Sequence, residues 1–112
     1  MKQIGKIYIS GPVSGTFDYM ERFQAAEDKL ERGGFSVVNP VRVNAELPEN
    51  TTHEEYMSVS MELLKMCDYV YMMEGWERST GANREYGYAM GAGIIIITEQ
   101  ELKQRVAARG DD

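Results

Sequence analysis

Short hydrophobic runs alternate with longer amphipathic stretches along the chain. Four runs are rich in β-branched and aromatic residues and are bounded by glycine, proline or polar residues, which is typical of β-strands. They cover residues 4–10, 35–38, 68–73 and 94–97. The last run consists of isoleucine alone and has no polar face. We therefore expect it to be a central parallel strand that is buried on both sides.

Apolar residues at helical spacing fill the intervals between these strands. The stretches cover residues 19–30, 52–66 and 80–90, and another begins at residue 98. Three of the predicted helices start with a capping box, in which a polar N-cap residue is followed three positions later by a glutamate. These pairs are Asp18 with Glu21, Thr52 with Glu55, and Thr98 with Glu101.

The resulting order, β-α-β-α-β-α-β-α, predicts a parallel sheet with helices on both faces. We expect an α/β fold of the flavodoxin- or Rossmann-like, doubly wound type, with three α/β/α layers and a single domain over residues 1–112. We also expect the strand order 2-1-3-4, which puts the topological switch point between strands one and three. Ligands of such folds bind outside the carboxyl ends of those two strands.

Two loops rich in small and polar residues follow these two strands, at residues 11–15 and 74–81. The second leads into a helix, whose free N–H groups and dipole favour an anion. We therefore predict a ligand crevice between the loops, with the polar segment 41–50 as a further loop over one edge. The hydroxyl residues of these loops have turn formation and helix capping as structural alternatives, and an exposed indole in such a loop is a candidate surface for stacking on a base. The candidate binding residues are Gly11, Ser14, Gly15, Trp76, Ser79, Thr80 and Gly81.

The candidate chemistry centres on one carboxylate in the helix after the second loop. Glu85 lies in the second turn of that helix, either because the helix dipole favours an acidic residue there or because it faces the crevice. Tyr8, in the first strand, either donates its hydroxyl to Glu85 or is an ordinary strand aromatic. Asp68 opens the third strand, as a solvated connection residue or as a second carboxylate for acid catalysis. The start of a parallel strand, however, lies at the end opposite the predicted crevice.

Composition narrows the possible partners and cofactors. The formal net charge of −6 argues against a nucleic-acid polymer as the partner but is compatible with a single nucleotide. One cysteine, Cys67, excludes an intramolecular disulfide and offers no zinc spacing. No constellation of metal ligands is visible in the sequence, and we expect neither a metal ion nor a cofactor. The chain lacks a signal-type start and any apolar run of about 18 residues, so we expect no membrane contact and a cytoplasmic location.

Three segments of the chain resemble the nucleoside 2-deoxyribosyltransferase-like superfamily, in particular its small branch from phages and bacteria. They read KIYISGPVSG near the start, VVNP after the second predicted strand, and CDYVYMMEGWERSTGANREYGYA later. The most specific part is the pattern S-x-G-x-x-x-E-x-G-Y-A at residues 79–89. The resemblance spans about residues 6–97 and implies the doubly wound fold argued above.

The resemblance also implies an activity. Glu85 matches the nucleophile that attacks the anomeric carbon of a nucleoside or nucleotide sugar, and Tyr8 matches the tyrosine that orients this carboxylate. Ser14, Gly15 and Ser79 match groups that hold the phosphate in members acting on 5′-monophosphates. The implied function is cleavage or transfer at the N-glycosidic bond of a (deoxy)nucleoside or its 5′-monophosphate, by a homo-oligomer that we expect to be a dimer.

Asp68 matches an aspartate that is linked in some members to protonation of the departing base, which conflicts with its position at the start of a strand. Many transferases of the superfamily also carry an acidic residue shortly before the glutamate, where this chain has the turn of residues 77–80. A non-catalytic module that binds or senses nucleotides in the same crevice is therefore the alternative expectation.

Overall fold

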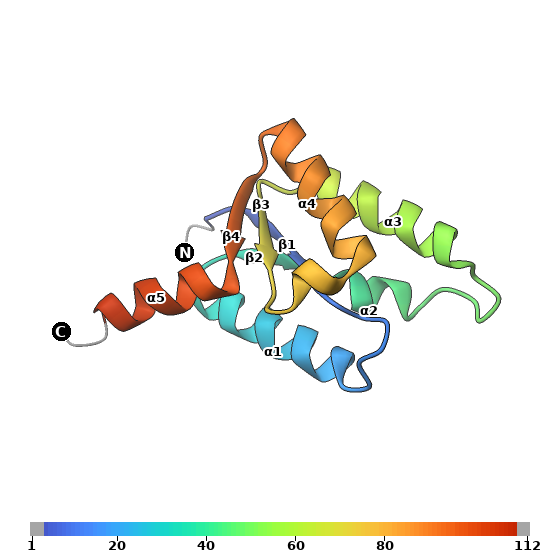
Figure 1. Ribbon diagram of the computed structural model, residues 1–112, viewed down its shortest axis with the longest axis horizontal. Helices are drawn as coiled ribbons and strands as arrows, with labels where there is room; N and C mark the ends of the chain where they lie inside the picture. The colour runs from blue at the N-terminus through green and yellow to red at the C-terminus, as the bar shows by residue number, and fades with distance from the viewer. Residues whose placement is uncertain (1–3, 110–112) are drawn as a thin grey trace.

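The computed structural model describes residues 4–109, and the side chains of residues 4–105. Every strand and helix predicted above is present, together with two short helices that were not predicted. In chain order the elements are β1 (Lys6–Ser10), α1 (Tyr19–Arg32), β2 (Ser36–Val38), α2 (Pro40–Asn44), α3 (His53–Lys65), β3 (Tyr69–Met72), the 3-10 helix η1 (Trp76–Arg78), α4 (Thr80–Ala92), β4 (Ile95–Thr98) and α5 (Glu99–Arg109) (Figure 1).

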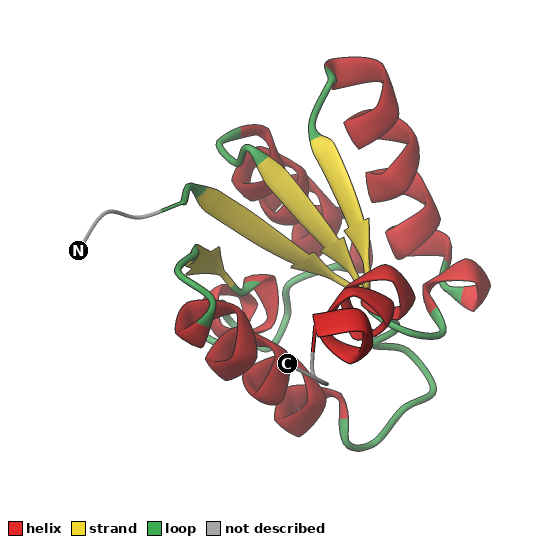
Figure 2. Cartoon of the chain, turned by 90° about the vertical axis from the view of Figure 1, so that its left-hand side faces the viewer, coloured by secondary structure: helices red, strands yellow, loops and turns green. Residues whose placement is uncertain are grey.

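The four strands form one parallel sheet in the order β2-β1-β3-β4, which confirms the predicted topology. Helices flank the sheet on both sides, as Figure 2 shows. Successive strand residues point to opposite faces. Ile7 and Ile9 of β1 therefore pack with α1, whereas Tyr8 packs with α3 and α4 on the other face. Each face of the sheet thus packs against helices through its own hydrophobic cluster, which gives the predicted three α/β/α layers.

Helix α2 corrects the prediction that residues 41–50 form a loop. Asn39 caps this helix, since its side-chain oxygen accepts a hydrogen bond from the Val41 N–H at 3.1 Å. Pro40 occupies the first helical position, where its missing N–H costs nothing. The Asn-Pro pair, which sequence analysis treated only as the end of a strand, therefore also starts a helix.

Two of the three predicted capping boxes are formed. Thr52 and Glu55 exchange hydrogen bonds at the start of α3, and Thr98 and Glu101 do so at the start of α5. The third prediction is wrong, because the Asp18 side chain makes no capping hydrogen bond at the start of α1. The residue has φ −103° and ψ 21°, outside the extended conformation that N-cap residues usually adopt.

The prediction of a fully buried final strand is also wrong. β4 pairs with β3 and lies at the edge of the sheet, and its first residue, Ile95, is 55% exposed. Ile96 packs against the cluster on the α4 side and Ile97 against the opposite cluster. An all-isoleucine run does not distinguish an edge strand from a central one, because the strand order decides which neighbours cover it. β4 leads directly into α5, which projects beyond the sheet in Figure 1.

Candidate active site

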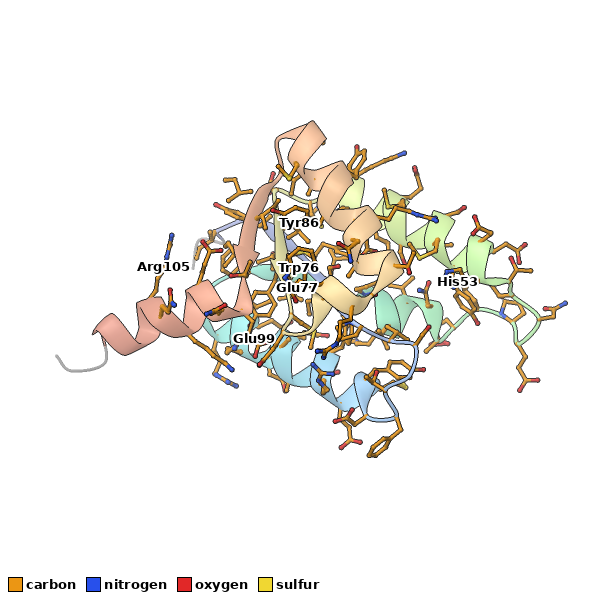
Figure 3. All side chains as sticks on the ribbon, viewed as in Figure 1. His53, Trp76, Glu77, Tyr86, Glu99 and Arg105 are labelled. Atoms are coloured by element: carbon orange, nitrogen blue, oxygen red, sulfur yellow. The ribbon has the colours of Figure 1, made fainter. Side chains whose placement is uncertain are left out.

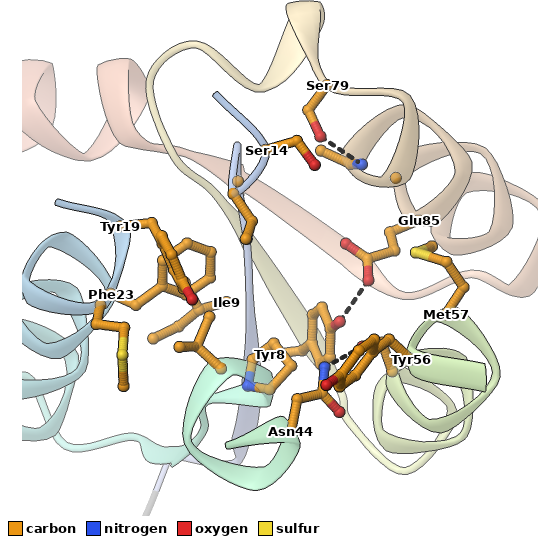
Figure 4. Close-up of a pocket in the computed structure, with 18 of the residues that line it drawn as sticks. Tyr8, Ile9, Ser14, Tyr19, Phe23, Asn44, Tyr56, Met57, Ser79 and Glu85 are labelled. Carbon is orange, nitrogen blue, oxygen red and sulfur yellow. Dashed lines mark hydrogen bonds between the residues drawn. The ribbon is translucent and has the colours of Figure 1, made fainter. Parts of the chain in front are cut away.

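The Glu85 carboxylate is buried and is held by two hydroxyl groups from β1, of which Figure 4 shows that of Tyr8. Tyr8 donates its phenolic hydrogen to Oε2 of Glu85, and Ser10 donates to Oε1 at 2.6 Å. Only 6% of Glu85 and 1% of each hydroxyl residue is exposed. Each carboxylate oxygen thus accepts a charge-assisted hydrogen bond, so the carboxylate has a fixed orientation.

The local sequence explains why these three groups meet. Tyr8 and Ser10 are two positions apart in a strand and so share the face toward α4. On α4, Ala82, Glu85 and Ala89 recur at helical spacing and are all buried. The two alanines let the helix approach the sheet closely, and the glutamate between them is directed at the end of β1.

Burial raises the pKa of Glu85 above the ordinary range of a glutamate, and the hydrogen bonds from Ser10 and Tyr8 act in the opposite direction. The pKa of Tyr8 lies well above that of a free tyrosine, first because the hydroxyl is buried and then because the Glu85 charge lies beside it. Tyr8 therefore stays protonated and remains a donor, while Glu85 is an acceptor once it has lost its proton.

Glu85 and Tyr8 line a cavity of about 390 Å³ at the carboxyl end of β1 (Figure 4). Its walls come from the loop after β1, the start of α4, and the helices α1, α2 and α3. Helix α1 lines the cavity with aromatic and apolar side chains, and α2 and α3 add polar ones. The main helical contributors are Tyr19, Phe23, Asn44, His53, Tyr56, Met57 and Ser60. An apolar cleft with a few convergent polar groups is typical of a small-molecule site.

One polar atom in this wall has no partner. Asn44 donates from Nδ2 to the Ser60 hydroxyl at 3.3 Å, but its Oδ1 is buried and accepts no hydrogen bond. Ser60 in turn lies beside Tyr8 and lowers its pKa, against the stronger effect of burial. A buried acceptor without a donor is costly, so a ligand group that donates to Asn44 would remove this cost.

A second cavity of about 420 Å³ adjoins the first and shares Ser14, Ser79 and Gly81 with it. It lies between the loop after β1 and the loop after β3. Ser79 caps α4 by accepting from the Ala82 N–H at 3.2 Å. The first N–H groups of an α-helix have no intrahelical partner, so the start of α4 offers donors to an anion here.

Residues 5–98 match the protein family described as "Domain of unknown function (DUF4406)". The chain belongs to this family. Comparison with curated proteins gives no match.

Two solved structures share the fold. The first is the 2-deoxyribosyltransferase of the psychrotolerant bacterium Bacillus psychrosaccharolyticus, with a TM-score of 0.67, 20% identity, and coverage of 83% of this chain and 70% of that chain. The second is a 2-desoxiribosyltransferase from Leishmania mexicana, with a TM-score of 0.62, 22% identity, and coverage of 83% of this chain and 62% of that chain. The DUF4406 chain thus has the 2-deoxyribosyltransferase-like α/β fold that its sequence predicted.

The structure brings most of the predicted site residues of this DUF4406 member together. Glu85, Tyr8, Gly11, Ser14, Ser79 and Gly81 line the first cavity, and Gly15 and Thr80 line the second. Gly11 is required for a close approach, because a Cβ there would lie 2.9 Å from the Cβ of Met73. The roles assigned to all these residues stay predictions.

Two predicted residues lie elsewhere. Asp68 is exposed at the amino end of β3, and its carboxylate accepts from the Lys6 backbone N–H at 3.1 Å. It therefore links the amino ends of β1 and β3, at the end of the strands opposite the cavities. Trp76 is partly buried and stacks on Tyr86, with ring centroids 4.6 Å apart (Figure 3), and it lines neither of the two cavities.

Several residues of the site were not predicted. Ser10 lines neither cavity but holds Glu85, and it had a signal, because it lies two positions after Tyr8 and must share its face of the strand. His53 is the exposed first residue of α3 (Figure 3), and it lines the first cavity. Asn44 belongs to α2, which sequence analysis had treated as a loop, so its convergence with Ser60 of α3 and with Tyr8 could not be foreseen.

No group of three or more His, Cys, Asp or Glu side chains suited to a metal ion occurs among the described residues. Within residues 4–109, no helix is both long and apolar enough to span a membrane. The predicted dimer and the cytoplasmic location stay predictions.

Proposed function

We propose that this protein cleaves or transfers at the N-glycosidic bond of a (deoxy)nucleoside or a nucleoside 5′-monophosphate, with Glu85 as the nucleophile. The observation that carries the proposal is the buried carboxylate, fixed by Tyr8 and Ser10, at a cavity wide enough for a nucleoside. The neighbouring structures are described as 2-deoxyribosyltransferases, which supports the same chemistry here.

The carboxylate suits this reaction for a physical reason. Cleavage of a glycosidic bond develops positive charge on the sugar, and an adjacent carboxylate stabilises that charge or forms a covalent glycosyl intermediate. A carboxylate has about four lone-pair sites, and the two hydroxyl donors occupy only two of them. Glu85 therefore stays available to a sugar carbon while its orientation is fixed.

The ligand's orientation follows from the two ends of the crevice. A 5′-phosphate would lie at the junction of the two cavities, where Ser14, Ser79 and the first N–H groups of α4 offer donors. The base would then lie toward α2 and α3, where Asn44 Oδ1 lacks a donor. This arrangement puts the sugar between the two ends, beside Glu85.

Departure of the base needs a proton donor other than Asp68, which lies at the opposite edge of the sheet. His53 and Tyr56 line the cavity on the α3 side and carry exchangeable hydrogens, so we assign this role to one of them. A His53→Gln variant that releases base at the wild-type rate would leave Tyr56 as the donor.

A non-catalytic nucleotide-binding module is the second candidate. It is favoured by one observation: Glu85 is the only carboxylate among the residues that line the first cavity. A base-release assay separates the two candidates. The wild-type protein and a Glu85→Gln variant are incubated with ribo- and deoxyribonucleosides and their 5′-monophosphates, with and without a second free base, and analysed by chromatography.

Release of base by the wild-type protein, lost in Glu85→Gln, would support a hydrolase. Exchange that requires the second base would support a transferase. If the wild-type protein binds a nucleotide, as judged by thermal shift, but neither releases nor exchanges base, the binding module is the correct function.

A further inference from the structure

The second cavity has features that a single 5′-phosphate does not explain. It is about 420 Å³ in volume, as large as the cavity assigned to the nucleoside. Only its inner edge, at Ser14, Ser79 and Gly81, is shared with the first cavity. A single phosphate group at this edge would leave the outer part of the second cavity empty.

Two arginines from different elements line that outer part. Arg22 comes from α1, and its Nη2 donates to the Glu74 carbonyl oxygen at 3.2 Å. Arg78 comes from η1, and its Nη2 would lie 3.2 Å from a Cβ built on Gly75. Since Glu74 and Gly75 are consecutive, both guanidinium groups lie against the same turn at the end of β3.

The charges of these arginines are not neutralised within the described part of the chain. Neither guanidinium forms an ion pair with a carboxylate there. Glu74 also lines this cavity, but its carboxylate lies 3.6 Å from the Lys103 ammonium, and its N–H donates to Glu99 at 2.8 Å. Two unpaired arginines beside one cavity are notable in a chain with a net charge of −6.

Guanidinium groups suit phosphate oxygens because they present several N–H donors in a planar fork. The Glu74 carbonyl takes one donor of Arg22, and an arginine has five. We propose that the second cavity binds the outer phosphate of a nucleoside 5′-diphosphate or triphosphate, through Arg22 and Arg78. This inference rests on the proposed function, since it takes the inner phosphate position from there.

A binding experiment with the Glu85→Gln protein tests the proposal without turnover. Calorimetry compares a nucleoside with its 5′-mono-, di- and triphosphate at fixed salt, and inorganic tripolyphosphate serves as a probe that contains no nucleoside. We expect the diphosphate to bind about ten- to hundredfold more tightly than the monophosphate, since one outer phosphate gains charge-assisted hydrogen bonds. Arg22→Gln and Arg78→Gln should each reduce that ratio about tenfold or more.

Two controls separate binding from folding and from charge in general. Arg84→Gln removes an exposed arginine of α4 that lines neither cavity and should leave the ratio unchanged. Arg22→Lys keeps the charge but loses the planar fork, so it should restore only part of the ratio. Thermal unfolding of each variant without ligand shows whether it is folded.

Equal affinities for the mono- and diphosphate, or a ratio that both arginine variants preserve, would overturn the inference and leave the proposed function intact. Tripolyphosphate binding that depends on Arg22 and Arg78, without binding of any nucleoside or nucleotide, would support the anion site and contradict the proposed function. Absence of binding by every probe would contradict both.

Discussion

A Tyr8→Phe substitution measures how much the phenolic hydroxyl contributes to holding Glu85. The ring is 1% exposed, and phenylalanine fills the same space, so the change removes one hydrogen bond to a buried carboxylate. Such a bond contributes about 1.5–3 kcal/mol. For a domain of this size, about 4 °C of melting temperature corresponds to 1 kcal/mol, so we expect a decrease of about 6–12 °C near pH 7.

Tyr71 provides a matched control in the neighbouring strand. It is as buried as Tyr8, at 1% exposure, but its hydroxyl has no hydrogen-bond partner. Tyr71→Phe removes a buried hydroxyl without breaking a hydrogen bond, so it should leave the unfolding free energy unchanged or raise it by about 1 kcal/mol. The two variants have the same change in atoms, which isolates the hydrogen bond.

Thermal and urea unfolding of both variants are the assay, together with the pH dependence of base release. Loss of the Tyr8 donor leaves Ser10 as the donor to Glu85 and raises the pKa of Glu85 further, so the acid limb of activity should move to higher pH in Tyr8→Phe. Equal unfolding free energies for the two variants, or an unmoved acid limb, would refute the role given to Tyr8.

The remaining predictions concern stability. Gly11→Ala should destabilise the protein by about 1–3 kcal/mol in urea unfolding, because its Cβ would lie 2.9 Å from Met73 Cβ; Gly87→Ala, with open space around it in α4, should instead stabilise by about 0.5–1 kcal/mol. Thr52→Ala should lower the unfolding free energy by about 1 kcal/mol, because it removes the capping box of α3, and an unchanged transition would show that this box contributes nothing. Burial raises the pKa of Glu85 in the folded protein, so the folded state binds this proton more tightly than the unfolded state does. The resulting stabilisation is complete below the ordinary glutamate pKa of about 4.3 and is lost as the pH rises through the pKa of Glu85 in the folded protein. The melting temperature of Glu85→Gln should accordingly rise relative to wild type across that range, and a difference that falls with pH would contradict the assigned direction.

The sequence predicted the architecture because its signals were local and repeated. Alternation of apolar runs with helical spacing gave the order of elements, and the parallel order with short connections restricted the topology. The meeting of Tyr8 and Glu85, far apart in the chain, followed from the position of the switch point. Strand parity and helix spacing then put both side chains on the faces that meet.

The errors arose where neighbours across space decide the outcome. Residues 94–97 looked like a central strand from their composition alone, although the predicted order 2-1-3-4, which the structure confirms, already puts the fourth strand at an edge. Trp76 looked like a stacking surface for a base, but its ring stacks on the ring of Tyr86, which belongs to the following helix α4. The polar wall of the cavity at Asn44 could not be predicted, because helix α2 was not.

Mass spectrometry of the acid-quenched protein is the most direct test of Glu85 as the nucleophile. The wild-type protein is mixed with a nucleotide that it turns over, quenched within the first turnovers, digested and mapped. We predict an added mass equal to the glycosyl group, that is the sugar or sugar phosphate less one water, on the peptide that contains Glu85, and none in Glu85→Gln. An adduct on another residue, or turnover by Glu85→Gln at the wild-type rate, would contradict the account.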